Sequence, residues 1–138
     1  MKPSLLPGLT HEFSFTVGET KTVPHLYPES TYFQQMPHVL ATGYLVGLME
    51  WACIEAVTPH LDWPREQTLG THVDFSHVAA TPPGLTITVS VRLDSVAGRK
   101  LTFTVSAHDG VETISEGTHE RHVIDVERFN AKVAAKIP

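Results

Sequence analysis

The chain has 138 residues, a length that predicts a single domain spanning residues 1–138. Hydrophobic residues make up 41% of it, which is enough for an ordinary packed core. The formal net charge of −5 argues against nucleic acid or an anionic membrane as a partner of the whole molecule.

Cysteine content and apolar runs predict a cytoplasmic protein. Cys53 is the only cysteine, so no intramolecular disulfide can form, as is typical of a reducing compartment. The apolar surroundings of Cys53 favour a core thiol over a nucleophile. The N-terminus lacks the apolar stretch of a signal peptide, and the longest apolar run, residues 39–57, contains Glu50 and Glu55 and is a poor membrane span.

Positive charge is concentrated in the C-terminal part of the chain. Seven of the ten Lys and Arg residues follow residue 90, namely Arg92, Arg99, Lys100, Arg121, Arg128, Lys132 and Lys136. This region can offer cations to a phosphorylated ligand, although composition by itself favours an ordinary solvated surface.

Two segments precede the central part of the chain. Within residues 11–24, Phe13 and Phe15 alternate with polar residues, which predicts a strand with one buried face. The proline-bounded segment 27–37 follows, with a short helical turn expected after Ser30. Its apolar side chains, Tyr32, Phe33 and Met36, must pack against another part of the protein.

A helix is predicted from Thr42 to about Pro59. Apolar residues recur there at helical spacing, Thr42 is a good N-cap, and Pro59 ends the pattern. Other apolar residues fill most of the remaining circumference, so we expect the helix to be buried on nearly every side.

Residues 70–126 are predicted to form four antiparallel strands. Apolar residues alternate along 71–79, 85–93 and 101–107, which gives each of these strands one buried face. Two tight hairpins are expected, at Ala97-Gly98 and at Asp109-Gly110. After Asp125, a short amphipathic helix is expected to close the chain.

This order of elements predicts the α+β hot-dog fold, in which a curved antiparallel sheet wraps one long central helix. A single sheet leaves edge strands uncovered, and these are liable to pair with another chain. We therefore expect a homodimer joined edge to edge.

Glu50 and His77 are the strongest candidates for acid–base chemistry. Glu50 is the only charged residue between Ala41 and Ile54, in a helix expected to be buried. A carboxylate removed from water needs partners or a raised pKa, and either suits a general base or nucleophile. Strand alternation points His77 inward, where a lone histidine is more often structural, but beside Glu50 it makes a plausible acid–base pair.

Thr42 has a structural and a functional interpretation at the same place. It can cap the helix, and the free N–H groups there can stabilise an oxyanion. Gly43 lets a ligand approach the backbone closely. Thr42 and Glu50 are eight residues apart, about 12 Å along one helix, so they cannot touch. Either a bound substrate lies between them, or Thr42 of one protomer meets Glu50 of the other.

The HERH sequence at residues 119–122 resembles a metal motif but has the wrong geometry. On a strand, His119 and His122 point to opposite faces, and the helical zinc motif needs two histidines four residues apart. We therefore expect no metal. His119 and Arg121 can share a face, and Arg121 can either order a site or bind phosphate.

Several long stretches, in order, resemble the fluoroacetyl-CoA thioesterase family, a family of dimeric hot-dog hydrolases. The resemblance runs from about His11 to Lys136. The matching stretches are HLYPES (25–30), ATGYLVGLMEWAC (41–53), LGTHVDFSHVAATPPGLT (69–86), SAHDGV (106–111), GTHER (117–121) and FNAKV (129–133).

The resemblance implies site residues and a reaction. The family's catalytic Thr, Glu and His fall on Thr42, Glu50 and His77. An active-site Gly falls on Gly70, and an Arg near the substrate falls on Arg121. An apolar lid over the acyl group falls on Val23, Leu26, Phe33 and Met36.

The implied reaction is hydrolysis of a short acyl-CoA, fluoroacetyl-CoA being the named candidate. No metal or separate cofactor is implied, since coenzyme A is part of the substrate. Met36 departs from the family, which has a Phe tied to gating and to fluoroacetyl preference; a flexible Met fills space differently.

The competing hypotheses are a thioesterase for another small acyl-CoA and a non-catalytic acyl-CoA-binding module. A hot-dog enoyl-CoA hydratase is disfavoured because its Asp and His, five residues apart, have no counterpart here.

Overall fold

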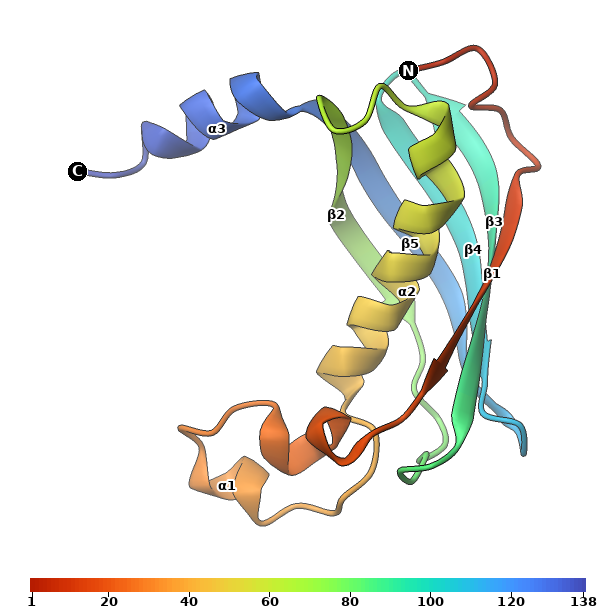
Figure 1. The fold of residues 1–138 in the computed structure, drawn as a ribbon, viewed down its shortest axis with the longest axis vertical. Coiled ribbons are helices and arrows are strands. Elements are labelled where there is room, and N and C mark those ends of the chain that lie inside the picture. Colours follow the sequence, from red (N-terminus) through yellow and green to blue (C-terminus); the bar gives the residue numbers. More distant parts are fainter.

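The computed structural model describes residues 1–138 and contains one antiparallel sheet curved around one long helix (Figure 1). The strands are β1 (Thr10–Thr16), β2 (Glu66–Phe75), β3 (Thr86–Ala97), β4 (Lys100–His108) and β5 (Thr113–Asp125). The helices are α1 (Thr31–Gln34), α2 (Thr42–Val57) and α3 (Val126–Ala134), with single 3₁₀ turns at Glu19–Lys21, Val23–His25 and Thr58–His60.

The strand order is β1-β3-β4-β5-β2, with every neighbouring pair antiparallel. Hairpins join β3 to β4 and β4 to β5, whereas β2 pairs with β5, from which β3 and β4 separate it in the sequence. β1 and β2 are consequently the two edges of the sheet. The four antiparallel strands after the helix are confirmed, and their spatial order comes from the structure.

The concave face of the sheet carries the core, as the alternation of apolar residues predicted. Ile87, Val89, Phe103 and Val105 are at most 1% exposed. Both predicted hairpins are present, and each has a glycine in the left-handed region, Gly98 at φ +63° and Gly110 at φ +89°.

Helix α2 packs one face into this sheet. That face consists of Leu45, Leu48, Met49, Ala52, Cys53, Ala56 and Val57. The expectation of burial on nearly every side is wrong for the single chain, because the opposite face is left open. Trp51, for example, is 46% exposed, although its ring lies 4.5 Å from that of Phe13.

The predicted cap of α2 is displaced by one residue. Ala41 is the N-cap, with extended φ and ψ, and no side chain caps the helix. Thr42 is already the first helical residue, and its hydroxyl group is therefore available for another partner.

Strand β2 begins and ends earlier than predicted. It runs from Glu66 to Phe75, with a bulge between Gly70 and His72 where it faces β5. His77 therefore lies in the loop that follows, where Val78 donates its N–H to the carbonyl of Ile114. This loop, and not the alternation of a strand, positions the His77 side chain.

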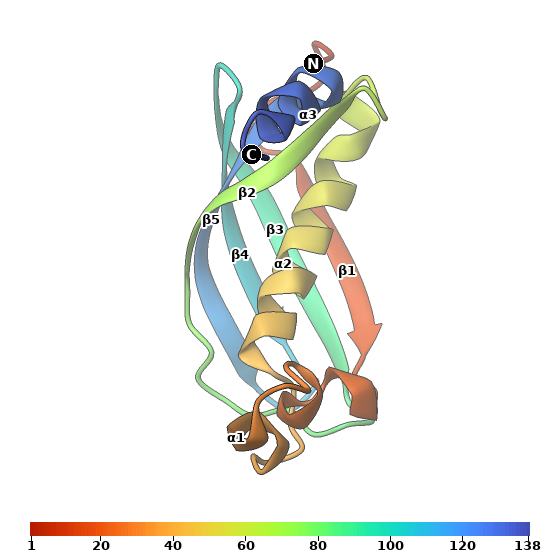
Figure 2. The same ribbon diagram turned by 90° about the vertical axis from the view of Figure 1, so that its left-hand side faces the viewer.

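Two short elements lie at opposite ends of α2. The predicted turn after Ser30 is α1, capped by the Ser30 hydroxyl, and it lies with the 3₁₀ turns Glu19–Lys21 and Val23–His25 near the beginning of α2 (Figure 1). The predicted C-terminal helix is α3, capped by Asp125. It projects away from the sheet at the other end (Figure 1) and points toward the viewer in Figure 2, and none of its residues is buried. No helix is both long enough and apolar enough to cross a membrane.

Candidate active site

Glu50 lies on the open face of α2 and is held by a buried arginine. An Arg121 Nη1–H donates to Glu50 Oε2 at 2.8 Å. The Glu50 side chain is 38% exposed, whereas that of Arg121 is 2% exposed. The carboxylate is thus not removed from water in the single chain; its distinctive feature is a fixed, charge-assisted hydrogen bond.

Three further contacts fix the Arg121 guanidinium within the sheet. Its Nε–H donates to Thr68 Oγ1 at 2.8 Å, and an Nη2–H donates to the Thr68 carbonyl at 2.8 Å. Its Nη1 also lies 3.1 Å from His119 Nε2. Because most of its N–H groups have partners inside the protein, the structure favours the ordering role for Arg121 over phosphate binding.

His119 is a member of this network that the sequence interpretation did not identify. It is fully buried, and its Nδ1 lies 2.7 Å from the carbonyl of His72, at the bulge of β2. Donation from Nδ1–H to that carbonyl leaves Nε2 as an acceptor for Arg121. The sequence indicates only that His119 can share a strand face with Arg121, and the structure confirms this shared face.

Gly70 is required by the closeness of β2 to the carboxylate. A Cβ atom at this position would lie 2.8 Å from Glu50 Oε2 and 3.3 Å from His119 Cε1. Gly70 is also paired with Arg121 in the sheet register. Any larger residue here would displace the Glu50 side chain or its partners.

Thr42 and His77 form a second pair, at the beginning of α2. Thr42 Oγ1 lies 2.8 Å from His77 Nδ1, and the other ring nitrogen, Nε2, is buried without a hydrogen-bond partner. The inward orientation predicted for His77 is confirmed, although a loop produces it. Direct contact with Thr42 was not predicted.

One residue of the predicted lid, Leu26, contacts this end of the helix. Leu26 lies directly over Gly43, where a Cβ would be 3.0 Å from Leu26 Cδ2. Phe33, on α1, stacks at 5.6 Å on Tyr27. Val23 is half-buried, and Met36 is 46% exposed at the outer side of the segment.

The candidate residues therefore form two groups within one chain. Thr42, Gly43 and His77 lie at the beginning of α2, close to Leu26, and Glu50, Gly70 and Arg121 lie with His119 farther along α2. Eight residues separate Thr42 from Glu50, which is about 12 Å of helix. No contact within the single chain joins the two groups.

Other reactive side chains are outside these groups. Cys53 is fully buried, and desolvation raises the pKa of its thiol to about 12, which fits the predicted core role. No group of three or more His, Cys, Asp or Glu side chains is arranged to hold a metal ion.

Acid should destabilise the fold through two histidines, the buried His119 and the half-buried His77. Burial lowers the pKa of both His77 and His119 below the usual 6.5. In the unfolded chain they protonate near 6.5, so below that pH the unfolded state binds more protons and the free energy of unfolding falls. Urea denaturation at pH 7.5 and 5.5 should show this fall. The fall in the free energy of unfolding should be smaller in His77→Gln than in the wild type. In the control variant His122→Gln, at an exposed position, the fall should equal that of the wild type.

Comparisons with known proteins agree with this arrangement. Residues 17–127 match the family model of the fluoroacetyl-CoA-specific thioesterases, FlK. The fluoroacetyl-CoA thioesterase of Streptantibioticus cattleyicolor is 55% identical over 138 residues, which cover 100% of this chain and 99% of that protein.

Solved structures show the same similarity in three dimensions. A structure of the fluoroacetyl-CoA thioesterase FlK, at 55% identity, superposes with a TM-score of 0.94 over 98% of this chain and 99% of that one. A thioesterase superfamily member from Thermus thermophilus, at 24% identity, has a TM-score of 0.84 over 98% and 94% of the two chains. The predicted hot-dog fold is confirmed, and the chain belongs to the fluoroacetyl-CoA-specific thioesterase family.

Proposed function

We propose that this chain hydrolyses fluoroacetyl-CoA to fluoroacetate and free CoA. The observation that carries the proposal is the 55% identity to a fluoroacetyl-CoA thioesterase along the whole chain. The geometry supports it, because Thr42 lies within hydrogen-bond distance of His77 and Glu50 accepts a hydrogen bond from Arg121. The reaction needs no separate cofactor, since CoA is part of the substrate, and we place it in the cytoplasm.

Glu50 is the proposed base or nucleophile. It either attacks the thioester carbonyl carbon, giving an anhydride that water then hydrolyses, or it removes a proton from the attacking water. In both routes the carbon–sulfur bond breaks and the CoA thiolate takes up a proton. The hydrogen bond from Arg121 holds the carboxylate in one orientation for this step.

Thr42 and His77 are proposed to stabilise the oxyanion and move protons. If His77 Nδ1–H donates to Thr42 Oγ1, the Thr42 hydroxyl proton is directed outward, where it can bond a developing oxyanion together with the N–H groups at the start of α2. His77 Nε2 then has a free lone pair. Its lowered pKa keeps it unprotonated at neutral pH, ready to accept a proton from substrate.

A homodimer is part of the proposal, because it would unite the two groups. β2 is an unpaired edge whose Leu69 and Val73 are 38% and 46% exposed, beside the open face of α2. Pairing with β2 of a second copy would cover this surface and bring Thr42 of one protomer toward Glu50 of the other. Sedimentation equilibrium should give the mass of two chains; the mass of one chain at all concentrations would contradict the dimer.

The substrate is tested by free-CoA release from acetyl-CoA and fluoroacetyl-CoA. We expect the wild type to prefer the fluorinated ester. Met36→Phe should increase that preference by about tenfold, a typical effect of reshaping an apolar pocket. Equal cleavage of both esters by the wild type would favour the alternative of a thioesterase for another small acyl-CoA. Cleavage of neither would favour a non-catalytic binding module.

A further inference from the structure

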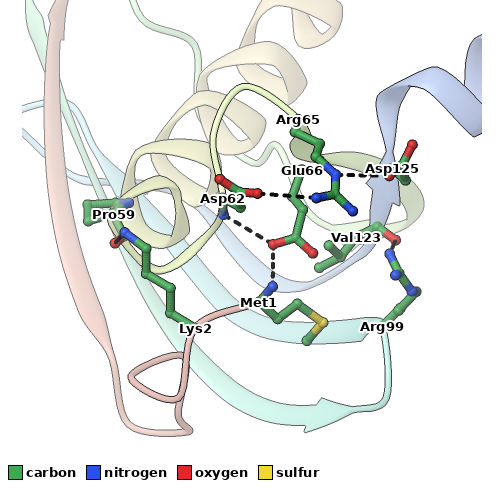
Figure 3. Close-up of polar contacts among 9 residues, drawn as sticks. All are labelled: Met1, Lys2, Pro59, Asp62, Arg65, Glu66, Arg99, Val123 and Asp125. Carbon is green, nitrogen blue, oxygen red and sulfur yellow. Dashed lines mark hydrogen bonds and ion pairs between the residues drawn. The ribbon is translucent and has the colours of Figure 1, made fainter.

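Two buried side-chain atoms have no hydrogen-bond partner in the chain, namely His77 Nε2 and Ser115 Oγ. Such atoms are rare in folded proteins, because a polar group that is buried without a partner loses its hydrogen bonds to water and gains none in return. By contrast, even the half-buried carboxylate of Glu66, at the far end of α2, accepts the N–H of Asp62 at 3.1 Å (Figure 3). His77 and Ser115 therefore need an explanation.

His77 and Ser115 lie directly opposite each other. The segment after β2 continues to pair with β5, because the N–H groups on either side of His77 donate to the carbonyls on either side of Ser115. These two hydrogen bonds are Ser76 N–H to the Glu116 carbonyl, at 3.0 Å, and Val78 N–H to the Ile114 carbonyl, at 2.9 Å. Two residues that lie between such bonds form a close antiparallel pair, with Cβ atoms about 4.5–5.5 Å apart.

Both side chains lie on the concave side of the sheet. Ser115 is fully buried and is paired with Ala107, which belongs to the core face of β4. The His77 ring is on the same side, where its Nδ1 lies 2.8 Å from Thr42 Oγ1. With Nδ1 engaged by Thr42, Nε2 is the ring atom that remains for Ser115.

The His77 ring is neutral at pH 7 and so has one donor and one acceptor nitrogen. Desolvation lowers the pKa of His77 below its usual 6.5, and a contact with the Ala79 backbone opposes this shift only in part. A neutral ring between two hydroxyl groups allows two arrangements of protons. In one, Ser115 donates to Nε2 and Nδ1–H donates to Thr42; in the other, every donor and acceptor is exchanged.

Burial of Ser115 distinguishes the two arrangements. If Nε2–H donated to Ser115, the proton of the Ser115 hydroxyl would be buried without an acceptor, because no other group of the protein bonds it. If Ser115 donates to Nε2, the only free proton is that of Thr42. Thr42 is exposed at the beginning of α2, so water or a substrate can accept this proton.

We propose that Ser115 is a positioning residue, which fixes the tautomer of His77 and thereby the direction of the Thr42 hydroxyl. Ser115 donates to Nε2, directly or through one buried water, and this places the ring proton on Nδ1 and turns the Thr42 proton toward the substrate. When Nε2 takes up a proton, the same hydroxyl can accept from it. The catalytic consequence rests on the proposed function, whereas the hydrogen bond does not.

Nitrogen NMR tests the hydrogen bond without any substrate, with the His77 signals identified by their absence from His77→Gln. At pH 7.5, His77 of the wild type should carry its proton on Nδ1 in most molecules. In Ser115→Ala the ring loses the donor that selects this form, and the Nε2–H form should grow severalfold. Ser115→Thr keeps the hydroxyl and should keep the wild-type tautomer. A proton mainly on Nε2 in the wild type, or no change in Ser115→Ala, would overturn the proposal.

Steady-state kinetics test the consequence for catalysis. In Ser115→Ala, the Thr42 hydroxyl can turn its proton to His77 Nδ1, so kcat for an acyl-CoA should fall about tenfold with KM nearly unchanged. This fall is smaller than the loss of 10²–10³ for removing an oxyanion donor outright, because Thr42 is still present. Ser115→Thr should retain most of the activity. The control Ser106→Ala removes a hydroxyl from the neighbouring strand β4 and should match the wild type.

A double variant separates positioning from a general disturbance of the fold. Thr42→Val lacks the hydroxyl whose proton Ser115 directs, so adding Ser115→Ala to it should lower kcat no further. A further tenfold fall, or an unchanged kcat in Ser115→Ala alone, would contradict the positioning role. If the wild type cleaves no acyl-CoA, the proposed function fails, and the NMR result still decides whether Ser115 holds His77.

Discussion

Glu50→Gln is expected to lower kcat/KM for thioester hydrolysis by a factor of about 10² to 10⁴, the usual contribution of a general base. The amide has nearly the same shape and keeps an oxygen that can accept from Arg121, but it cannot take up a proton or attack the carbonyl carbon. Because the substituted side chain is partly exposed, the fold should survive with a stability loss of about 1–2 kcal/mol. The measurement is free-CoA release alongside circular dichroism.

Glu55→Gln is a matched control for this change. Glu55 lies on the same helix, is also partly exposed, and lies 2.8 Å from an imidazole nitrogen, His11 Nε2. The chemical substitution is the same, but Glu55 lies outside both groups of the candidate site. We expect activity close to wild type. Similar losses of activity in the two variants would mean that each substitution disturbs α2, and that the Glu50 carboxylate takes no part in the reaction.

Arg121→Met is expected to reduce the free energy of unfolding by about 2–4 kcal/mol and to reduce activity as well. The substitution leaves the buried Thr68 hydroxyl and carbonyl, and His119 Nε2, without their donor. It also releases the Glu50 carboxylate from its fixed orientation. The partial exposure of Glu50 places the expected cost toward the lower part of the range for breaking a buried ion pair. Urea denaturation measures the loss.

Two further variants show whether the loss of stability comes from the Arg121 network. Arg92→Met removes an exposed arginine bonded to Asp94 and Thr104, and should cost less than about 1 kcal/mol. Arg121→Lys keeps the charge but loses the planar fork, so it should recover only part of the lost stability. If Arg121→Met unfolded at the same urea concentration as Arg92→Met, the network would have no structural role.

The sequence by itself determined the local elements and most of the candidate residues. Helix α2, the hairpins at Gly98 and Gly110, and the buried faces of β3 and β4 follow from apolar periodicity and turn residues, which act over a few neighbouring positions. Thr42, Glu50 and His77 stand out in the sequence because a hydroxyl, a carboxylate and an imidazole occupy unusual places in those patterns. The family resemblance implies the same three residues.

Only the tertiary structure decided how those residues are partnered. Glu50 and Arg121 are 71 positions apart in the sequence, and they meet because β5 pairs with β2 beside α2, in a register interrupted by a bulge after Gly70. That long-range register also places the His72 carbonyl against His119, which no local pattern indicates. The face of α2 that remains open depends on how far the sheet curves around it. Local periodicity specifies which residues alternate, whereas strand order, register and curvature arise from packing among distant segments.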